Sequence, residues 1–193
     1  LLRPGNVDLN RSQTAAPVAI QFLDSSVYES ADSGNNGGTT GSLDSTGADL
    51  LIAVLRTYRN PDLLLVNGTF SDSEGNTWTY LDATGNAEGK YGKIAYSYGT
   101  SLNTSSSHTI SIGSNSASGF WSLAFMAFSG ALTTSDPFDT EIFDAFNSIP
   151  TTFSAGTITP AVANELFIGG LTSTDNTATG AGTGFTSILA VPF

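Results

Sequence analysis

Two stretches of the chain are apolar at both odd and even positions. They are residues 50–55 (LLIAVL) and 121–128 (WSLAFMAF), whereas residues 108–112 (HTISI) alternate in the way of a half-buried strand. In a two-sheet sandwich only one face of each sheet meets the core. We therefore expect the outer face of these two strands to be covered too, by the chain's own arm or loops or by a neighbouring subunit.

The remaining pattern predicts short strands separated by turn signals. A loop is expected over residues 24–38, which contain SGNNGG, a turn at 74–76, and a short helix over 140–147. Many short strands at close spacing are typical of an all-β fold, here an antiparallel two-sheet sandwich of jelly-roll or Ig-like type. The strands are expected over residues 17–23, 39–44, 49–58, 62–70, 77–82, 93–98, 108–112 and 119–129.

Part of this pattern is written twice. DLLIAVL at 49–55 recurs as ELFIGGL at 165–171, and GNTWTYL at 75–81 recurs as GTGFTSI at 182–188. The repetition predicts two related β units, and a core strand in the second copy as in the first.

The domain organisation follows from the repeat. We expect one domain over residues 17–193, with repeat units at about 41–130 and 156–193, preceded by an extended N-terminal arm at 1–16. The second unit lacks counterparts of the last three strands of the first. Either the two halves are unequal or the chain is a truncated piece, or residues 1–23 supply a strand to the gap, within this chain or in the next subunit.

Composition narrows the class of partner. The 193 residues include 6 Lys and Arg against 17 Asp and Glu, a net charge of -11, and no Cys. Strong negative charge disfavours nucleic acid and anionic membranes, and the absence of Cys excludes disulfides and thiolate metal sites. No apolar run is long enough for a membrane span. The chain begins at Leu1, which indicates either a removed leader or a fragment.

Catalytic chemistry has little support in the sequence. His108 is the only histidine and follows three serines, so a Ser-His-Asp arrangement is formally available. Nothing resembles the Gly-x-Ser-x-Gly context of an exposed nucleophile, and no strand carries two glutamates placed for glycoside hydrolysis. We therefore expect His108 to be a strand-edge histidine and the protein not to be an enzyme.

Two acidic segments are candidate calcium ligands, because calcium takes several oxygens from one irregular segment. The first holds Asp136, Asp139 and Glu141, and the second is the turn at 72–76. Neither has the spacing of a twelve-residue calcium loop, and a solvated turn is the alternative for each. No other cofactor is expected.

Aromatic residues are the candidate ligand contacts, because sugar rings stack on Tyr and Trp faces. Trp78 is expected in the core, whereas Tyr91, Tyr96 and Tyr98 are candidate glycan-binding residues. Acceptor tripeptides for N-glycosylation begin at Asn10, Asn67 and Asn103.

The turns and core strands resemble a widespread, poorly characterised β-sandwich family of secreted bacterial proteins and phage structural proteins. The resemblance covers about residues 40–188 and implies a display, adhesion or shell role without defining site residues. It rests on five motifs: GNTWT at 75–79, KIAYSY at 93–98, residues 120–129 followed by GALTTSDPFD at 130–139, NELFIGG at 164–170, and GTGFT at 182–186.

These observations predict a non-enzymatic structural or adhesive subunit of an extracellular assembly, such as a virion surface or a filament. Its partners are expected to be further copies of the chain or other structural subunits. The alternative is a carbohydrate-binding module, whose partner is a glycan.

Overall fold

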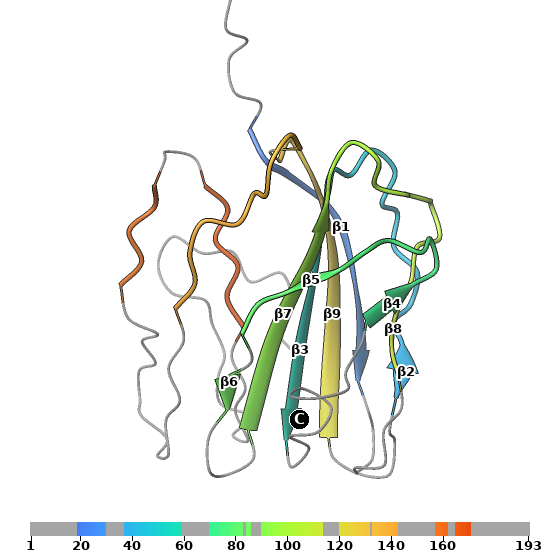
Figure 1. Cartoon of the computed structure of the whole chain (residues 1–193). Helices are drawn as coiled ribbons and strands as arrows, with labels where there is room; N and C mark the ends of the chain where they lie inside the picture. Colours follow the sequence, from blue (N-terminus) through green and yellow to red (C-terminus); the bar gives the residue numbers. More distant parts are fainter. Residues whose placement is uncertain are drawn as a thin grey trace, which may run out of the picture.

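The computed structural model (Figure 1) describes residues 19–29, 37–58, 70–82, 84–85, 90–113, 120–131, 133–142, 157–161 and 165–170. All regular structure in these residues is β-strand, in two antiparallel sheets, which confirms the predicted all-β two-sheet sandwich. The strands are β1 (Gln21–Glu29), β2 (Gly38–Thr39), β3 (Leu50–Tyr58), β4 (Phe70–Asp72), β5 (Thr79–Tyr80), β6 (Thr84–Gly85), β7 (Lys90–Tyr98), β8 (Ile110–Ile112) and β9 (Phe120–Ser129).

The larger sheet has the strand order β1-β9-β3-β7-β5, with β6 also paired to β7. Its centre is β3, which pairs along its whole length with β7 on one side and β9 on the other. A central strand with both faces covered needs apolar residues at both parities. The strands predicted at 49–58 and 119–129 correspond to β3 and β9 and are confirmed to within one residue at their ends.

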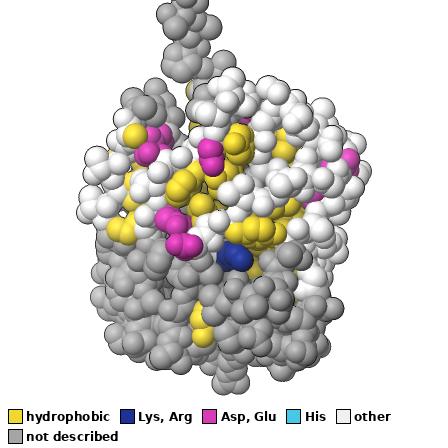
Figure 2. Space-filling view, in the orientation of Figure 1, with side chains coloured by type: hydrophobic (Ala, Val, Ile, Leu, Met, Phe, Trp, Pro, Cys, Tyr) yellow, Lys and Arg dark blue, Asp and Glu magenta, His cyan; other side chains and the backbone are white. Residues whose placement is uncertain are grey.

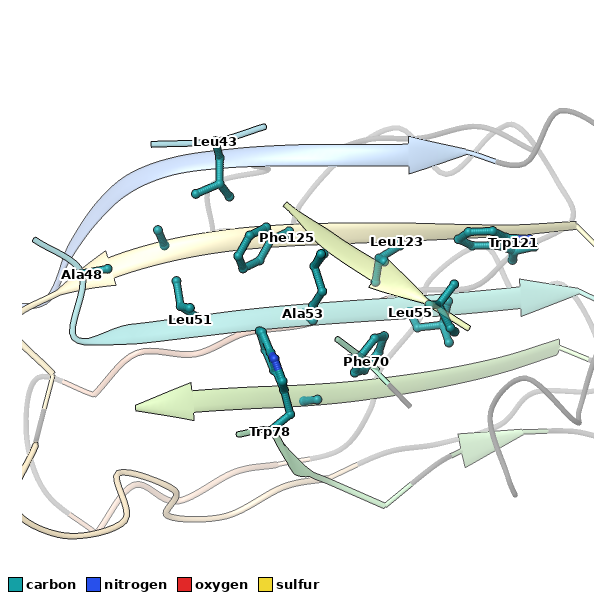
Figure 3. Packing of buried hydrophobic residues seen from close by; sticks show 14 residues of the cluster. Leu43, Ala48, Leu51, Ala53, Leu55, Phe70, Trp78, Trp121, Leu123 and Phe125 are labelled. Carbon is teal, nitrogen blue, oxygen red and sulfur yellow. The ribbon is translucent and has the colours of Figure 1, made fainter. Parts of the chain in front are cut away.

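The smaller sheet has the order β2-β8-β4 and packs across the inner face of the larger one. An antiparallel bridge between Leu43 and His108 extends the contact beyond β2. Figure 3 shows the core between the two layers, where Leu51 of β3 lies near Phe125 of β9 and Leu55 of β3 lies beside Leu123 of β9. Fourteen buried apolar residues form this cluster, and their removal from water supplies the main driving force for folding.

The outer face of the larger sheet is buried by the chain itself. Leu50, Ile52 and Met126 form a second buried cluster there, and Leu166 and Ile168 pack against it. A Cβ placed on residue 170 would lie 2.9 Å from Val54 Cγ1, which shows how closely this segment approaches the sheet. The sequence left open whether the chain itself or a neighbouring subunit covers this face. In the structure, later segments of the same chain, drawn in orange and red in Figure 1, cover it.

Two sequence predictions differ from the structure. The loop expected over 24–38 is wrong for residues 24–29, which belong to β1. Polar Asp24 suits this edge strand because its carboxylate accepts the backbone N–H groups of Ser25 and Asp44. The core strand expected from the second copy of the repeat is also wrong for residues 165–170, which carry no regular secondary structure and lie on the outer face.

Other predictions fall partly outside the described residues. Residues 140–142 carry no helix, and the rest of the expected helix, the arm at 1–16 and most of the strand at 62–70 lie outside the described part of the chain. The turn at 74–76 is confirmed: Gly75 has φ 74°, and its N–H donates to the carbonyl of Asp72. Glycine adopts this left-handed conformation without steric cost.

Candidate functional site

Three side chains that are far apart in the sequence meet at one end of the sandwich. Ser45 lies in the loop before β3, Asp72 ends β4, and His108 lies just before β8. Oγ of Ser45 is 2.8 Å from Nδ1 of His108, and Oδ1 of Asp72 is 3.3 Å from Nε2. The residue types are those of a catalytic triad, so their accessibility and their other partners decide what they can do.

The three side chains of this network are buried and contact other groups of the protein. The side chains of His108 and Asp72 and the whole of Ser45 have no exposed surface. Ser45 Oγ accepts the N–H of Ser105 and donates to the Ser105 carbonyl, at 3.0 and 3.1 Å. The edge of the His108 ring faces the ring of Phe125, with centroids 5.0 Å apart. A nucleophile must reach a substrate, so in this fold the three residues tie loops together instead.

Asp72 is the hub of the network. Its carboxylate accepts N–H groups from the backbones of Glu74 and Asn76 and from Nε1 of Trp78, the last at 2.7 Å. Burial alone would raise the pKa of Asp72, but the adjacent His108 ring and the hydrogen bonds from Asn76, Trp78 and Glu74 outweigh burial and lower the pKa to about 2. Asp72 is therefore a carboxylate at neutral pH, held by donors from the following turn.

The candidate tyrosines are divided between two faces of β7. Tyr91 packs against the core between the sheets, whereas Tyr96 and Tyr98 lie on the outer face, with ring centroids 6.1 Å apart. β7 begins at Lys90, earlier than the predicted strand at 93–98, so Tyr91 lies within it. The alternation of side chains along a strand imposes this division. Trp78 lies in the core, as the sequence predicts.

The structure joins one candidate tyrosine to one candidate calcium ligand. The hydroxyl of Tyr96 donates to both carboxylate oxygens of Asp136, at 2.8 and 3.0 Å. Burial raises the pKa of Tyr96, and the hydrogen bond and the negative charge of Asp136 raise it further. Phe138 stacks on Tyr96 with centroids 6.3 Å apart and is 41% exposed. Tyr98, Tyr96 and Phe138 thus form a row of rings beside one carboxylate. No pattern in the sequence pointed to Phe138 as part of this row.

The other proposed acidic ligands do not gather around Asp136. Asp139 accepts the backbone N–H of Ala161, and Glu141 is exposed. Within the described ranges, no group of three or more acidic or histidine side chains is placed to hold a metal ion. The second candidate, the turn at 72–76, uses its Asp72 carboxylate for the buried network.

Of the three glycosylation tripeptides, only the one at Asn103 lies in the described part of the chain. Asn103 is exposed, its Nδ2 donates to the Glu74 carbonyl, and its backbone exchanges hydrogen bonds with the side chain of Asn76. Asn103 therefore braces the turn that holds Asp72.

Comparison of the chain with protein-family models, curated proteins and solved structures yields no match. Among the described residues, no helix is long and apolar enough to cross a membrane. The functional argument therefore rests on the fold and on the contacts described above.

Proposed function

We propose that this chain is a non-enzymatic structural or adhesive module of an extracellular assembly, such as a virion surface or a filament. The observation that carries the proposal is the complete burial of Ser45 and His108. His108, Ser45 and Asp72 then stabilise the fold instead of carrying out catalysis. A rigid, acidic sandwich without a reactive cleft at this position suits a role that depends on surface contacts.

The surface available for such contacts is different from the one that the sequence indicated. Leu50 and Ile52 are buried by the chain's own residues, so the outer face of the sheet offers no support for a neighbouring subunit. The covering segments carry apolar side chains of their own. Phe138, Ile142 and Phe167 are 41%, 39% and 41% exposed. We call the two covering segments, residues 133–142 and 165–170, the cover. The contact that we propose lies on the cover instead of on the sheet.

The arrangement of the cover supports this proposal. In residues 165–170, Leu166 and Ile168 pack on the sheet while Phe167, between them, is exposed. Figure 2 shows hydrophobic side chains reaching the surface where β7 and β5 adjoin segment 133–142, with acidic side chains beside them. Exposed apolar groups bordered by polar ones are typical of protein contact sites.

Light scattering coupled to size exclusion tests the proposal with matched variants. We expect the wild-type protein to self-associate, and Phe138→Ser together with Phe167→Ser to shift it towards monomer. Leu23→Ser is the control, because Leu23 is 38% exposed but lies on the edge strand β1 and not in the covering segments. Equal association of wild type and the double variant would contradict the proposed surface.

The rings of Tyr98, which is half-buried, and Phe138, which is exposed, lie on either side of the buried Tyr96 and favour carbohydrate binding as a second candidate function. Aromatic rings beside a carboxylate can stack on a sugar ring and accept bonds from its hydroxyls. Glycan-array binding that is lost in Tyr98→Ala and kept in Tyr91→Ala would support it, because Tyr91 packs on the other face of β7. Absence of glycan binding by the wild type would exclude it.

A further inference from the structure

The cover is acidic as well as apolar. Its two segments contain no lysine or arginine and carry four carboxylates, those of Asp136, Asp139, Glu141 and Glu165. The first three of these residues are exposed, as are the rings of Phe138 and Phe167. The surface therefore offers apolar contact and negative charge together to whatever binds it.

These charges restrict how two copies of the chain can meet on the cover. A symmetric contact between the covers of two chains would place four carboxylates opposite four others. Like charges that face each other across an interface destabilise it. The complementary partner is a segment that is both apolar and positively charged, and in a self-assembling protein it has to come from a different part of the neighbouring chain.

The basic residues inside the sandwich are poorly placed to be that partner. Arg56 and Lys93 are half-buried and lie on β3 and β7, strands that are paired on both sides. Nε of Arg56 donates to Oγ of Ser122 at 2.6 Å. Nζ of Lys93 lies 4.6 Å from the centroid of the Tyr80 ring. Both cations therefore interact with groups of their own sheet.

The N-terminal arm, residues 1–16, has the complementary composition. It contains Arg3 and Arg11 against the single acidic residue Asp8, a net charge of +1, whereas residues 17–193 hold 4 basic and 16 acidic residues, a net charge of -12. Apolar side chains are interspersed with the arginines, at Leu1, Leu2, Val7 and Leu9.

The length of the arm allows contact with another molecule. The arm leads into β1, which lies at an edge of the larger sheet. Sixteen extended residues span up to about 50 Å. A compact chain of this size has a radius of gyration of about 16 Å, so the arm is long enough to reach the surface of a neighbouring copy.

We propose that residues 1–16 of one chain bind the cover of the next, with Arg3 and Arg11 beside the carboxylates of the cover and the leucines of the arm against Phe138 and Phe167. This inference rests on the proposed function, because it takes the cover to be the contact between copies. Each chain has one arm and one cover, so the contact can repeat along a filament or close into a ring.

Light scattering of arm variants of the full chain tests the inference. Arg3→Glu together with Arg11→Glu should raise the concentration at which half of the protein is associated by about tenfold. Arg3→Lys together with Arg11→Lys keeps the charge and should associate like wild type. If wild type associates through Phe138 and Phe167 but the glutamate variant associates equally well, the inference is wrong and the proposed function stands. A monomeric wild type contradicts both.

A charge exchange separates the contact from a general effect of net charge. Thr140→Lys together with Glu141→Lys changes two exposed positions of the cover and should weaken association when this variant is alone. Mixing it with the glutamate variant of the arm should restore association, because the acidic arm then meets the added lysines. Neither chain changes on mixing, so a folding defect cannot produce this recovery. A mixture that stays as dissociated as its components would overturn the inference, and it is the result expected if each arm binds its own chain.

Discussion

Replacing Asp72 by Asn tests whether the buried carboxylate holds its end of the sandwich together. The substitution preserves size and removes the charge. Asn offers one acceptor oxygen where the carboxylate offers two, so Nε1 of Trp78 and the backbone N–H groups of Glu74 and Asn76 compete for it. The amide nitrogen then faces donors, and a buried donor is left without a partner.

The magnitude follows from the pKa of Asp72, which lies at about 2 instead of the ordinary 3.8. At about 1.4 kcal/mol for each pH unit, this gap corresponds to about 2 kcal/mol of preference for the charged carboxylate in the folded protein. The unsatisfied donor adds a cost of similar size. We therefore expect Asp72→Asn to lower the free energy of unfolding at pH 7 by about 2–4 kcal/mol.

Urea denaturation followed by tryptophan fluorescence measures this loss, since Trp78 and Trp121 are both buried. Asp44→Asn is the matched control. Asp44 is an exposed carboxylate that accepts the N–H of Thr46, and a side-chain amide oxygen can replace it. If Asp72→Asn unfolds at the same urea concentration as wild type and Asp44→Asn, the carboxylate does not stabilise the fold and the reasoning is wrong.

Three further predictions follow from other contacts. The pKa of Asp72 is lower in the folded protein than in the unfolded chain, so the charged carboxylate stabilises the fold fully above about pH 4. This stabilisation is lost as the pH falls towards 2. Acid titration followed by circular dichroism should therefore show that wild type, but not Asp72→Asn, loses stability between about pH 4 and 2. Phe125→Ala should lower thermal stability by about 3–5 kcal/mol, because Phe125 is fully buried between the sheets; a loss below about 1 kcal/mol would mean that the core is not packed as described. Gly38→Ala should cost about 1–3 kcal/mol, because the new Cβ would lie 2.8 Å from the Tyr28 ring, whereas Gly113→Ala meets open space and should be close to neutral.

The central strands of the fold could be predicted because their signal is local. Apolar residues at both parities over 50–55 and 121–128 leave little choice other than buried strands, and both are strands of the larger sheet. β1 was predicted too early in the chain because Asp24, Ser25 and Ser26 look like loop residues. Their polar groups are accommodated by contacts with the segment at 41–44, which no local pattern reveals.

The candidate site depends on contacts that are distant in the sequence. Ser45 and His108 are 63 residues apart, and the two strands that place them belong to different sheets. Sequence reasoning treated His108 as a strand-edge residue, and the bridge to Leu43 fits that description, but its complete burial beside Asp72 could not be inferred. The core strand predicted for the repeated segment ELFIGGL was wrong for a different reason. Apolar residues that suit a core strand also suit a segment that covers the outer face of a sheet.

Self-association of the wild-type protein tests the proposed function most directly. Light scattering over a concentration series, at a salt concentration near 0.15 M that screens the net charge of -11, gives the mass of the particle in solution. We predict a mass that rises above the 19.9 kDa of one chain and returns to it when Phe138 and Phe167 are both replaced by serine. A wild-type mass of 19.9 kDa at every concentration would contradict a self-assembling structural role.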